Sequence, residues 1–197
     1  QTSYESASTS KLVSAVVILR LVEQGYLSLA DTPQEHISGW PITSSSNSLY
    51  NMTLEHLLSF TSGLTTEPIC LNAGLAIFDN CVNSIATTNA GNGITPGQQF
   101  YYASTHLQVA GLMAMRARGL ATWQDVFTEF KTQTGLFANS IYDLPSATNP
   151  RLAGGMHWTG EDYMAFLKAL KNGLLLNSTS MGQLLADHTA GVTIAYS

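Results

Sequence analysis

Ser8 and Lys11 are the residues whose types and spacing could do chemistry together. Side chains three residues apart on a helix lie on one face, about one turn from each other. A serine hydroxyl becomes an effective nucleophile when a neighbouring base takes its proton, and a neutral lysine amine can be that base. Lys11 is the only one of the four lysines with a serine three residues before it. The pair predicts a nucleophile with its base; the alternative is a chance spacing in a serine-rich chain.

The segment behind this pair must hold it in place. Residues 12–22 carry a single charge, at Arg20, which is typical of a helix that is apolar on nearly every side and therefore central. Burial in such surroundings favours the neutral form of a lysine amine. We expect the helix to cover residues 8–24 and to end at Gly25, because glycine often follows the last residue of a helix.

Composition limits the classes of function. The chain has 197 residues, about the length of one domain, and only 11% of them are charged. The net charge of −5 and the pI near 5.4 argue against a phosphate-binding surface, which needs clustered Lys and Arg. We therefore expect no nucleic-acid partner, and no apolar run reaches the length of a membrane span.

Cys70 and Cys81 are the only cysteines, and they lie in a stretch, residues 64–95, whose irregular pattern predicts loops and short helical turns. Two cysteines that bracket a loop suit a local disulfide, and disulfides persist in oxidising compartments. We expect a disulfide and a secreted or periplasmic protein; the alternative is two unpaired buried thiols. The five histidines show no metal-ligand spacing, so we predict neither a metal site nor a cofactor.

The rest of the chain is predicted to be mostly helical. Apolar spacing indicates five further helices, most of them behind a Ser or Thr cap. Their expected ranges are 53–60, 107–118, 122–134, 159–172 and 178 or 180 to 187. Residues 192–196 are the one candidate strand.

Five landmarks follow one another along the chain. They are Ser8-x-x-Lys11 and residues 21–31, 57–64, 96–104 and 153–162. In this order they resemble the serine β-lactamase and penicillin-binding-protein-like hydrolases, most closely the class C β-lactamase and carboxylesterase branch. The likeness runs from Ala7 to about Asp187.

The resemblance implies roles for particular residues. Ser8 would attack a carbonyl and form an acyl-enzyme, Lys11 would be its partner, and Tyr102 would be the second acid/base. A phenol suits that role only when its pKa falls from about 10, which the Lys11 ammonium would promote. Ser104 takes the place of the asparagine in the family's Tyr-x-Asn motif and would contact substrate. A hydroxyl lacks the amide's paired donor and acceptor, which favours simple esters over β-lactams or peptides.

The resemblance also implies a fold class. As present, the chain would be mostly α: one domain over residues 1–197, forming the helical part of an α/β sandwich whose strands are largely missing from it. The family places half of its oxyanion hole on a late strand with a Lys/His-Thr/Ser-Gly motif, which His188-Thr189-Ala190-Gly191 matches only faintly. We expect the chain to be a fragment, with the remainder of the polypeptide or a second chain covering the apolar nucleophile helix.

Two functions from different classes are consistent with these residues. The first is a serine hydrolase that acts on a small ester or amide through an acyl-serine and is inactive as an isolated fragment. The second is a non-catalytic binding, sensor or scaffold domain that keeps the same fold and cleft. Retention of Ser8, Lys11 and Tyr102 together favours the enzyme, because a scaffold has no need of all three.

Overall fold

The computed structural model describes residues 2–195, which form a mainly helical structure with short strands. The helices are α1 (Ser10–Glu23), α2 (Pro33–His36), α3 (Leu54–Leu58), α4 (Phe78–Asn89), α5 (Thr105–Arg118), α6 (Trp123–Thr134), α7 (Gly160–Lys171) and α8 (Ser178–Leu185). The strands are β1 (Ser3–Glu5), β2 (Gln99–Tyr101), β3 (Ile141–Tyr142), β4 (Met156–Thr159) and β5 (Thr193–Ala195). Short 3₁₀ turns cover Ala7–Thr9 and Ile69–Asn72.

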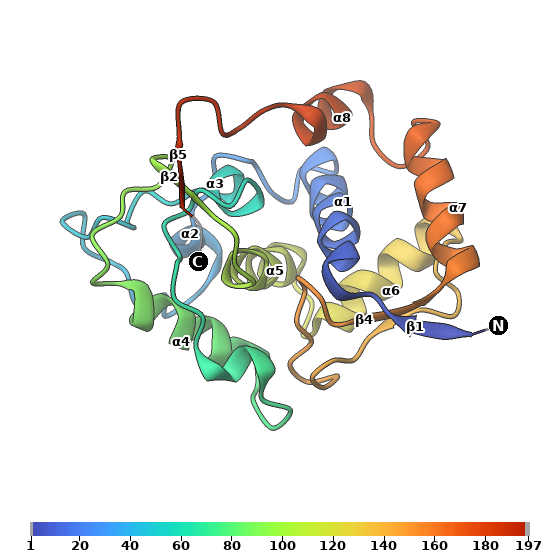
Figure 1. Ribbon diagram of the computed structural model, residues 1–197, viewed down its shortest axis with the longest axis horizontal. Helices are drawn as coiled ribbons and strands as arrows, with labels where there is room; N and C mark the ends of the chain where they lie inside the picture. The colour runs from blue at the N-terminus through green and yellow to red at the C-terminus, as the bar shows by residue number, and fades with distance from the viewer. Residues whose placement is uncertain (1, 196–197) are drawn as a thin grey trace.

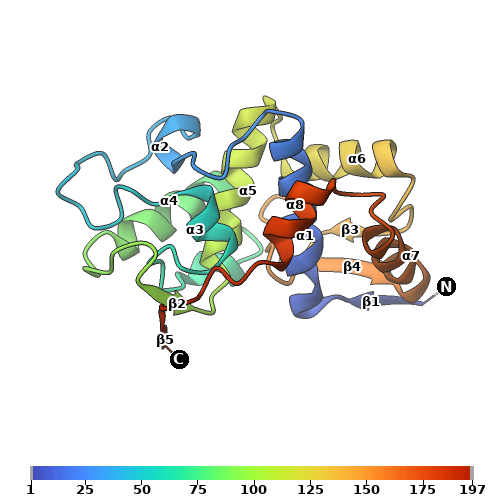
Figure 2. The ribbon, with the colours of Figure 1, turned by 90° about the horizontal axis from the view of Figure 1, so that it is seen from above.

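Helices α1 and α5 lie in contact at the centre of the molecule (Figure 2). Helices α2, α3 and α4 lie on one side of this pair, whereas α6, α7 and a three-stranded sheet lie on the other (Figure 2). In that sheet β4 is the middle strand and pairs antiparallel with both β1 and β3. Strand β2 pairs in parallel with β5 away from the sheet, beside α3 (Figure 1).

Helix α5 is the centre of the core, because every residue from Thr105 to Met115 is buried. Its Gly111 faces the loop that precedes β4, where a Cβ would lie 2.1 Å from Leu152 Cδ1. A side chain at this position would have to displace the buried Leu152 side chain, so glycine suits this close approach. The loop carries Ala153 next to Leu152, so the packing on α5 also fixes the backbone that faces Ser8.

Threonine caps set the starts of three predicted helices. The side chains of Thr53, Thr122 and Thr159 accept hydrogen bonds from backbone N–H groups in the first turns of α3, α6 and α7. Gly135 then ends α6 with a φ of 70°, a left-handed conformation that glycine adopts without strain. These predicted helices are confirmed to within a few residues.

The prediction of loops and short turns over residues 64–95 is wrong in its second half. Residues Phe78–Asn89 form helix α4, and Cys81 lies in its first turn and not in a loop. One face of the helix is buried at Phe78, Val82 and Ile85, which are spaced as on an amphipathic helix. Asn, Ser and Thr have modest helix propensity, and they make up enough of α4 to hide its periodicity.

The strand prediction was incomplete. Apart from β5, which confirms the predicted strand as far as Ala195, the structure contains β1, β2, β3 and β4; Tyr196 lies outside the described residues. In β1, Ser3 pairs with Thr159 and Glu5 with His157, although no strand was predicted near the N-terminus. Strands of two to four residues are too short to show an alternating pattern in sequence.

The expectation that α1 leaves a large apolar face uncovered is also wrong. Val13, Val16 and Ile18 are fully buried, and no residue from Ser10 to Val22 is exposed. Helices α5 and α6 pack on α1, and the chain after α7 returns across it, so that Leu184 of α8 borders the same small hollow as Ala15 and Leu19. The sequence gives no sign of this return.

Candidate active site

Ser8 lies in the 3₁₀ turn that leads into α1, so the predicted start of the helix was two residues early. Ala7, just before it, has a φ of +44°, which is unfavourable for any residue with a Cβ. The turn is held from both sides: the Ser6 and Ser10 hydroxyls contact each other, and Ser6 N–H donates to the Met156 carbonyl at 2.7 Å. A strained turn that its surroundings hold in place, and that leaves its serine exposed, is typical of functional sites.

The Ser8 hydroxyl receives two hydrogen bonds. Lys11 Nζ donates to Ser8 Oγ at 2.8 Å, and Tyr102 OH donates to the same oxygen at 2.9 Å. Lys11 is held by a further hydrogen bond to the Ala153 carbonyl at 2.9 Å. The predicted meeting of Ser8, Lys11 and Tyr102 is therefore confirmed, while their roles in catalysis stay predictions.

The environment of Tyr102 changes its acidity in the expected direction. The Lys11 amine, 4.6 Å from the centre of the ring, and the Ser8 hydroxyl lower the pKa of Tyr102 from 10, and partial burial offsets some of this effect. A nearby cation and hydrogen bonds to the phenol oxygen favour the phenolate, which is the form that accepts a proton. The site can therefore supply a base next to a nucleophile.

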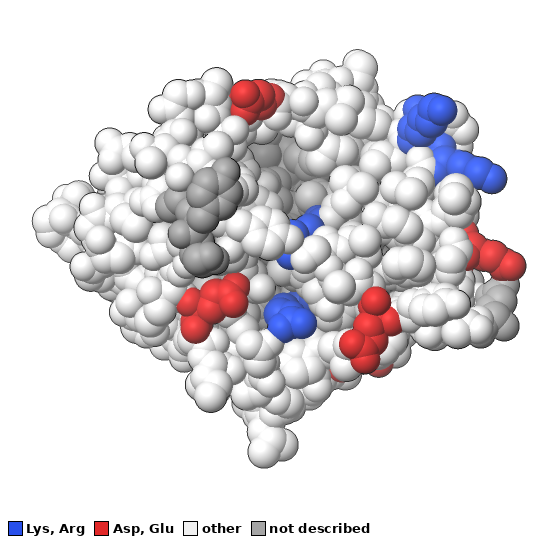
Figure 3. Space-filling model, viewed as in Figure 1, with Lys and Arg blue, Asp and Glu red and all other residues white. Residues whose placement is uncertain are grey.

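A hollow of about 460 Å³ opens in front of these groups, large enough for a small organic substrate. Its lining includes Ser8, Lys11, Tyr102, Ser104, Thr65, Glu67, Arg151 and the Ala153–Gly154 backbone. Figure 3 shows a hollow in the middle of this face, with Lys or Arg side chains in it and below it, and Asp or Glu nearby.

Two charged residues in the lining had no role in the sequence interpretation. Glu67 accepts a hydrogen bond from the backbone N–H of Ser104, at the N-terminus of α5, and Arg151 donates to Asn72. Ser104 lines the same hollow, and its contact with substrate stays a prediction. No spacing relative to Ser8 marks Glu67 or Arg151, because the fold brings them there from distant loops.

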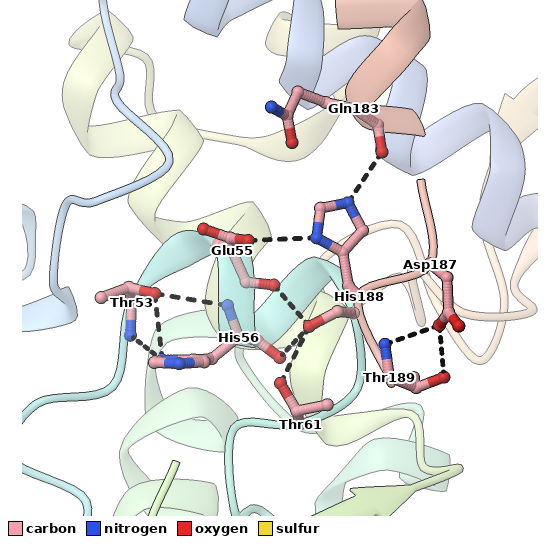
Figure 4. Close-up of polar contacts among 9 residues, drawn as sticks. Thr53, Glu55, His56, Thr61, Gln183, Asp187, His188 and Thr189 are labelled. Atoms are coloured by element: carbon pink, nitrogen blue, oxygen red, sulfur yellow. Dashed lines mark hydrogen bonds and ion pairs between the residues drawn. The ribbon is translucent and has the colours of Figure 1, made fainter. Parts of the chain in front are cut away.

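His188 does not belong to this site. Its Nδ1 lies 3.0 Å from Glu55 Oε1 and its Nε2 lies 2.8 Å from the Gln183 carbonyl, beside Thr189 and Asp187 (Figure 4). None of these residues lines the hollow at Ser8. The faint match of residues 188–191 to the family's late strand motif therefore carries no role in the described site.

Cys70 and Cys81 form a disulfide, which confirms the predicted pairing. It ties the 3₁₀ turn Ile69–Asn72 to α4, and Asn72 in that turn is the residue that holds Arg151 at the hollow. Among residues 2–195 no group of three or more His, Cys, Asp or Glu side chains is placed to hold a metal ion. Nor does that part of the chain contain a helix long and apolar enough to cross a membrane.

The comparison with protein families decides the relationship. The model of the family described as Beta-lactamase matches residues 1–194. The chain belongs to this family. Its fold is accordingly of the β-lactamase/transpeptidase type, as the five landmarks implied.

Several solved structures are similar in fold over most of this chain. A protein of Bacteroides dorei DSM 17855 assigned as a beta-lactamase is 26% identical, with a TM-score of 0.81, over 98% of this chain and 59% of that one. A penicillin-binding protein from Bacillus halodurans is 24% identical, with a TM-score of 0.75, over 95% of this chain and 64% of its own. EstCE1, a hydrolase with promiscuous acyltransferase activity, shares the fold at 17% identity and a TM-score of 0.74.

A curated relative, Protein flp of Staphylococcus aureus (strain COL), is 26% identical over 114 residues. That match covers 57% of this chain and 22% of Protein flp. The chain therefore spans less than two thirds of the length of these relatives.

Proposed function

We propose that this β-lactamase family chain carries the acyl-transfer centre of a serine hydrolase, with Ser8 as its nucleophile. The observation that supports this most is the pair of hydrogen bonds that Lys11 and Tyr102 donate to Ser8 Oγ, at 2.8 and 2.9 Å. The strained, exposed turn at Ala7 and the hollow in front of it add to this support.

The proposed reaction uses Tyr102 as the proton carrier. Ser8 Oγ bonds to the substrate carbonyl carbon while its proton passes to the Tyr102 phenolate, and the Lys11 ammonium stabilises that phenolate beforehand. When the tetrahedral intermediate collapses, the leaving alcohol or amine takes the proton from Tyr102. Water then attacks the acyl-serine, gives a proton to Tyr102, and the acid leaves as Ser8 regains its hydrogen.

The substrate that fits best is a small ester or amide. The hollow of about 460 Å³ is open and lined by both polar and charged groups. Ser104 stands where the family has an asparagine, and its shorter hydroxyl lacks the separate donor and acceptor groups that an asparagine amide offers to a substrate amide. We therefore place simple esters ahead of β-lactams and peptides, and the disulfide supports a secreted or periplasmic location.

The whole protein is proposed to need more than these residues for full turnover. The backbone N–H of Ser8, at the start of a helix, can be one donor to the oxyanion. A second donor comes from a late strand in the family, and we propose that residues outside this chain supply it. Residues 1–197 would then be the domain portion that holds the nucleophile and the proton carrier.

Covalent labelling tests the proposal directly. The purified chain is exposed to a fluorophosphonate, which transfers its phosphonyl group to an activated serine with loss of fluoride, and the labelled peptide is identified by mass spectrometry. We expect one adduct, on Ser8, and none in the Ser8→Ala variant. An unlabelled native chain, or an adduct on another serine, would contradict the proposal and favour a non-catalytic binding domain.

A further inference from the structure

His106 connects the buried core to the loop that carries Tyr102. It lies in the first turn of α5 and is fully buried. Its Nε2 is 2.8 Å from the Tyr101 carbonyl oxygen, and its Nδ1 is 2.8 Å from Ser62 Oγ. A carbonyl oxygen only accepts hydrogen bonds, so Nε2 carries the hydrogen and Nδ1 accepts from the Ser62 hydroxyl.

The imidazole is therefore used at both nitrogens in one tautomer. Burial lowers the pKa of His106 to about 4, so the ring is neutral at pH 7 and keeps Nδ1 as an acceptor. Ser62 is also fully buried, so water does not compete for either contact. This arrangement gives the ring a single orientation.

The peptide groups on both sides of Tyr101 are fixed by the same cluster. The Tyr101 N–H donates to the Phe60 carbonyl at 2.9 Å, while the Tyr101 carbonyl accepts from His106. The Phe60 ring meets the His106 ring edge-on at 5.0 Å and stacks on the Tyr102 ring at 5.8 Å. Phe60 and His106 thus hold the backbone just before Tyr102, and the Phe60 ring also supports the face of the Tyr102 ring.

Tyr102 needs such support because its side chain is 54% exposed. The Phe60 stack and the fixed backbone, together with the Lys11 amine 4.6 Å from the ring centre, hold this exposed ring in the orientation that brings its OH within 2.9 Å of Ser8 Oγ. A displacement of about 1 Å in a reacting group can cost on the order of 10²-fold in rate.

We propose that His106 is a positioning residue for Tyr102: its Nε2–H holds the Tyr101 carbonyl and so keeps the phenol against Ser8. The inference rests on the proposed function of Ser8 and Tyr102. His106 touches no reacting atom, and it acts through the main chain that it anchors.

Two variants of similar size separate the hydrogen bond from simple packing. His106→Gln can place an amide N–H where Nε2 was, whereas His106→Asn reaches only to the Nδ1 position and leaves the Tyr101 carbonyl without a donor. We expect the rate of fluorophosphonate labelling at Ser8 to fall about 10- to 100-fold in His106→Asn. In His106→Gln it should stay within a few-fold of the native rate.

The pH profile of labelling gives a readout that a purely structural role would not change. The labelling rate should rise with pH as Tyr102 ionises. Contacts with Lys11 and Ser8 lower the Tyr102 pKa, so loss of these contacts in His106→Asn should move this rise to higher pH. In His106→Gln the rise should stay in place. The inference would be overturned if His106→Asn labelled Ser8 at the native rate. It would also be overturned if both variants lost the same labelling rate with no shift in the pH profile. An unlabelled native chain would instead remove the proposed function itself.

Thermal unfolding shows whether each variant folds. If His106→Asn does not fold, Ser62→Ala supplies the second test, because it keeps the imidazole but removes the hydroxyl that fixes its tautomer. We expect Ser62→Ala to label Ser8 several-fold more slowly than the native chain, with the same direction of pH shift. An unchanged rate and profile in folded Ser62→Ala would overturn the inference.

Discussion

Ser8 and Lys11 lie close together in sequence, whereas Tyr102 comes from a distant part of the chain, so their contacts were not equally predictable. The Ser8 and Lys11 side chains are brought together by helical spacing alone, so residue types and positions suffice to predict that contact. Tyr102 lies 94 positions after Ser8, and only the family motif pointed to it. Its placement depends on Phe60, which lies within the landmark at residues 57–64, and on His106, which no short motif marks.

Tyr102→Phe should remove the pH dependence that the phenol gives to the reaction. The pKa of Tyr102 is lowered, and its ionised form is the proposed base, so labelling of Ser8 should rise with pH with a midpoint below pH 10. The variant should lose this limb and label Ser8 more slowly by on the order of 10²–10⁴-fold, as is usual when a general base is removed.

Tyr101→Phe is the matched control for this comparison, because it keeps the Tyr101 main chain that Phe60 and His106 hold. Stopped-flow or quenched labelling between pH 6 and about pH 10 measures both variants. A Tyr102→Phe profile that keeps the native limb would assign that limb to another group.

At the scale of the elements, helices with caps were predictable, whereas β5 was the one strand among the described residues that the sequence predicted. Thr53, Thr122 and Thr159 mark helix starts because a side-chain oxygen there satisfies N–H groups that the helix leaves unpaired. Strand β4 shows no such mark: its position depends on pairing with β1, whose Ser3 is 156 positions away from Thr159. Contacts that distant are a property of the whole fold, which local pattern cannot reveal.

The tight passage of the chain into β4 makes Gly155 a sensitive position. A Cβ at Gly155 would lie 2.0 Å from the Leu144 carbonyl oxygen and 2.8 Å from that of Arg151, so backbone and not a flexible side chain would have to move. We expect Gly155→Ala to lower the free energy of unfolding by about 3 kcal/mol, at the upper end of overpacking costs.

Gly160→Ala is the control on the same side of the molecule, because no atom lies within 4 Å of its added Cβ and Gly160 begins α7. It should leave stability within about 1 kcal/mol of native or raise it slightly. Urea unfolding of both variants measures the difference; equal stabilities would show that the loop before β4 shifts freely.

At the scale of the whole molecule, the hollow at Ser8 is a meeting point of segments from both ends of the chain. The turn Ala7–Thr9 meets the loop at Ala153 through Lys11, and the loop at Tyr102 through Ser8. The resemblance therefore predicted the fold type and the core of the site, while only the structure identified the lining residues Glu67 and Arg151. Loops vary most within a fold, so their chemistry is the least predictable part.

The arrangement of the site leads us to expect that Ser8 is acylated readily, while complete ester turnover is slow. The nucleophile and the proposed proton carrier lie within hydrogen-bond reach in this chain, so Ser8 should react with a fluorophosphonate. Ester turnover also needs a complete oxyanion hole, and loss of one donor typically lowers kcat by about 10²–10³. We therefore expect residues 1–197 to hydrolyse p-nitrophenyl acetate about 10²–10³-fold more slowly than a longer polypeptide that includes the late strand.

Ser8→Ala in both lengths sets the background for that comparison, and labelling stoichiometry gives the fraction of active sites in each preparation. Rates are then compared per labelled Ser8, so a difference in folding does not count as a difference in catalysis. Equal turnover per site in the two lengths would show that these 197 residues hold the whole oxyanion hole, with its second donor supplied by the backbone around the hollow. The Ala153–Gly154 segment, which already lines that hollow, would then be the place to look for it.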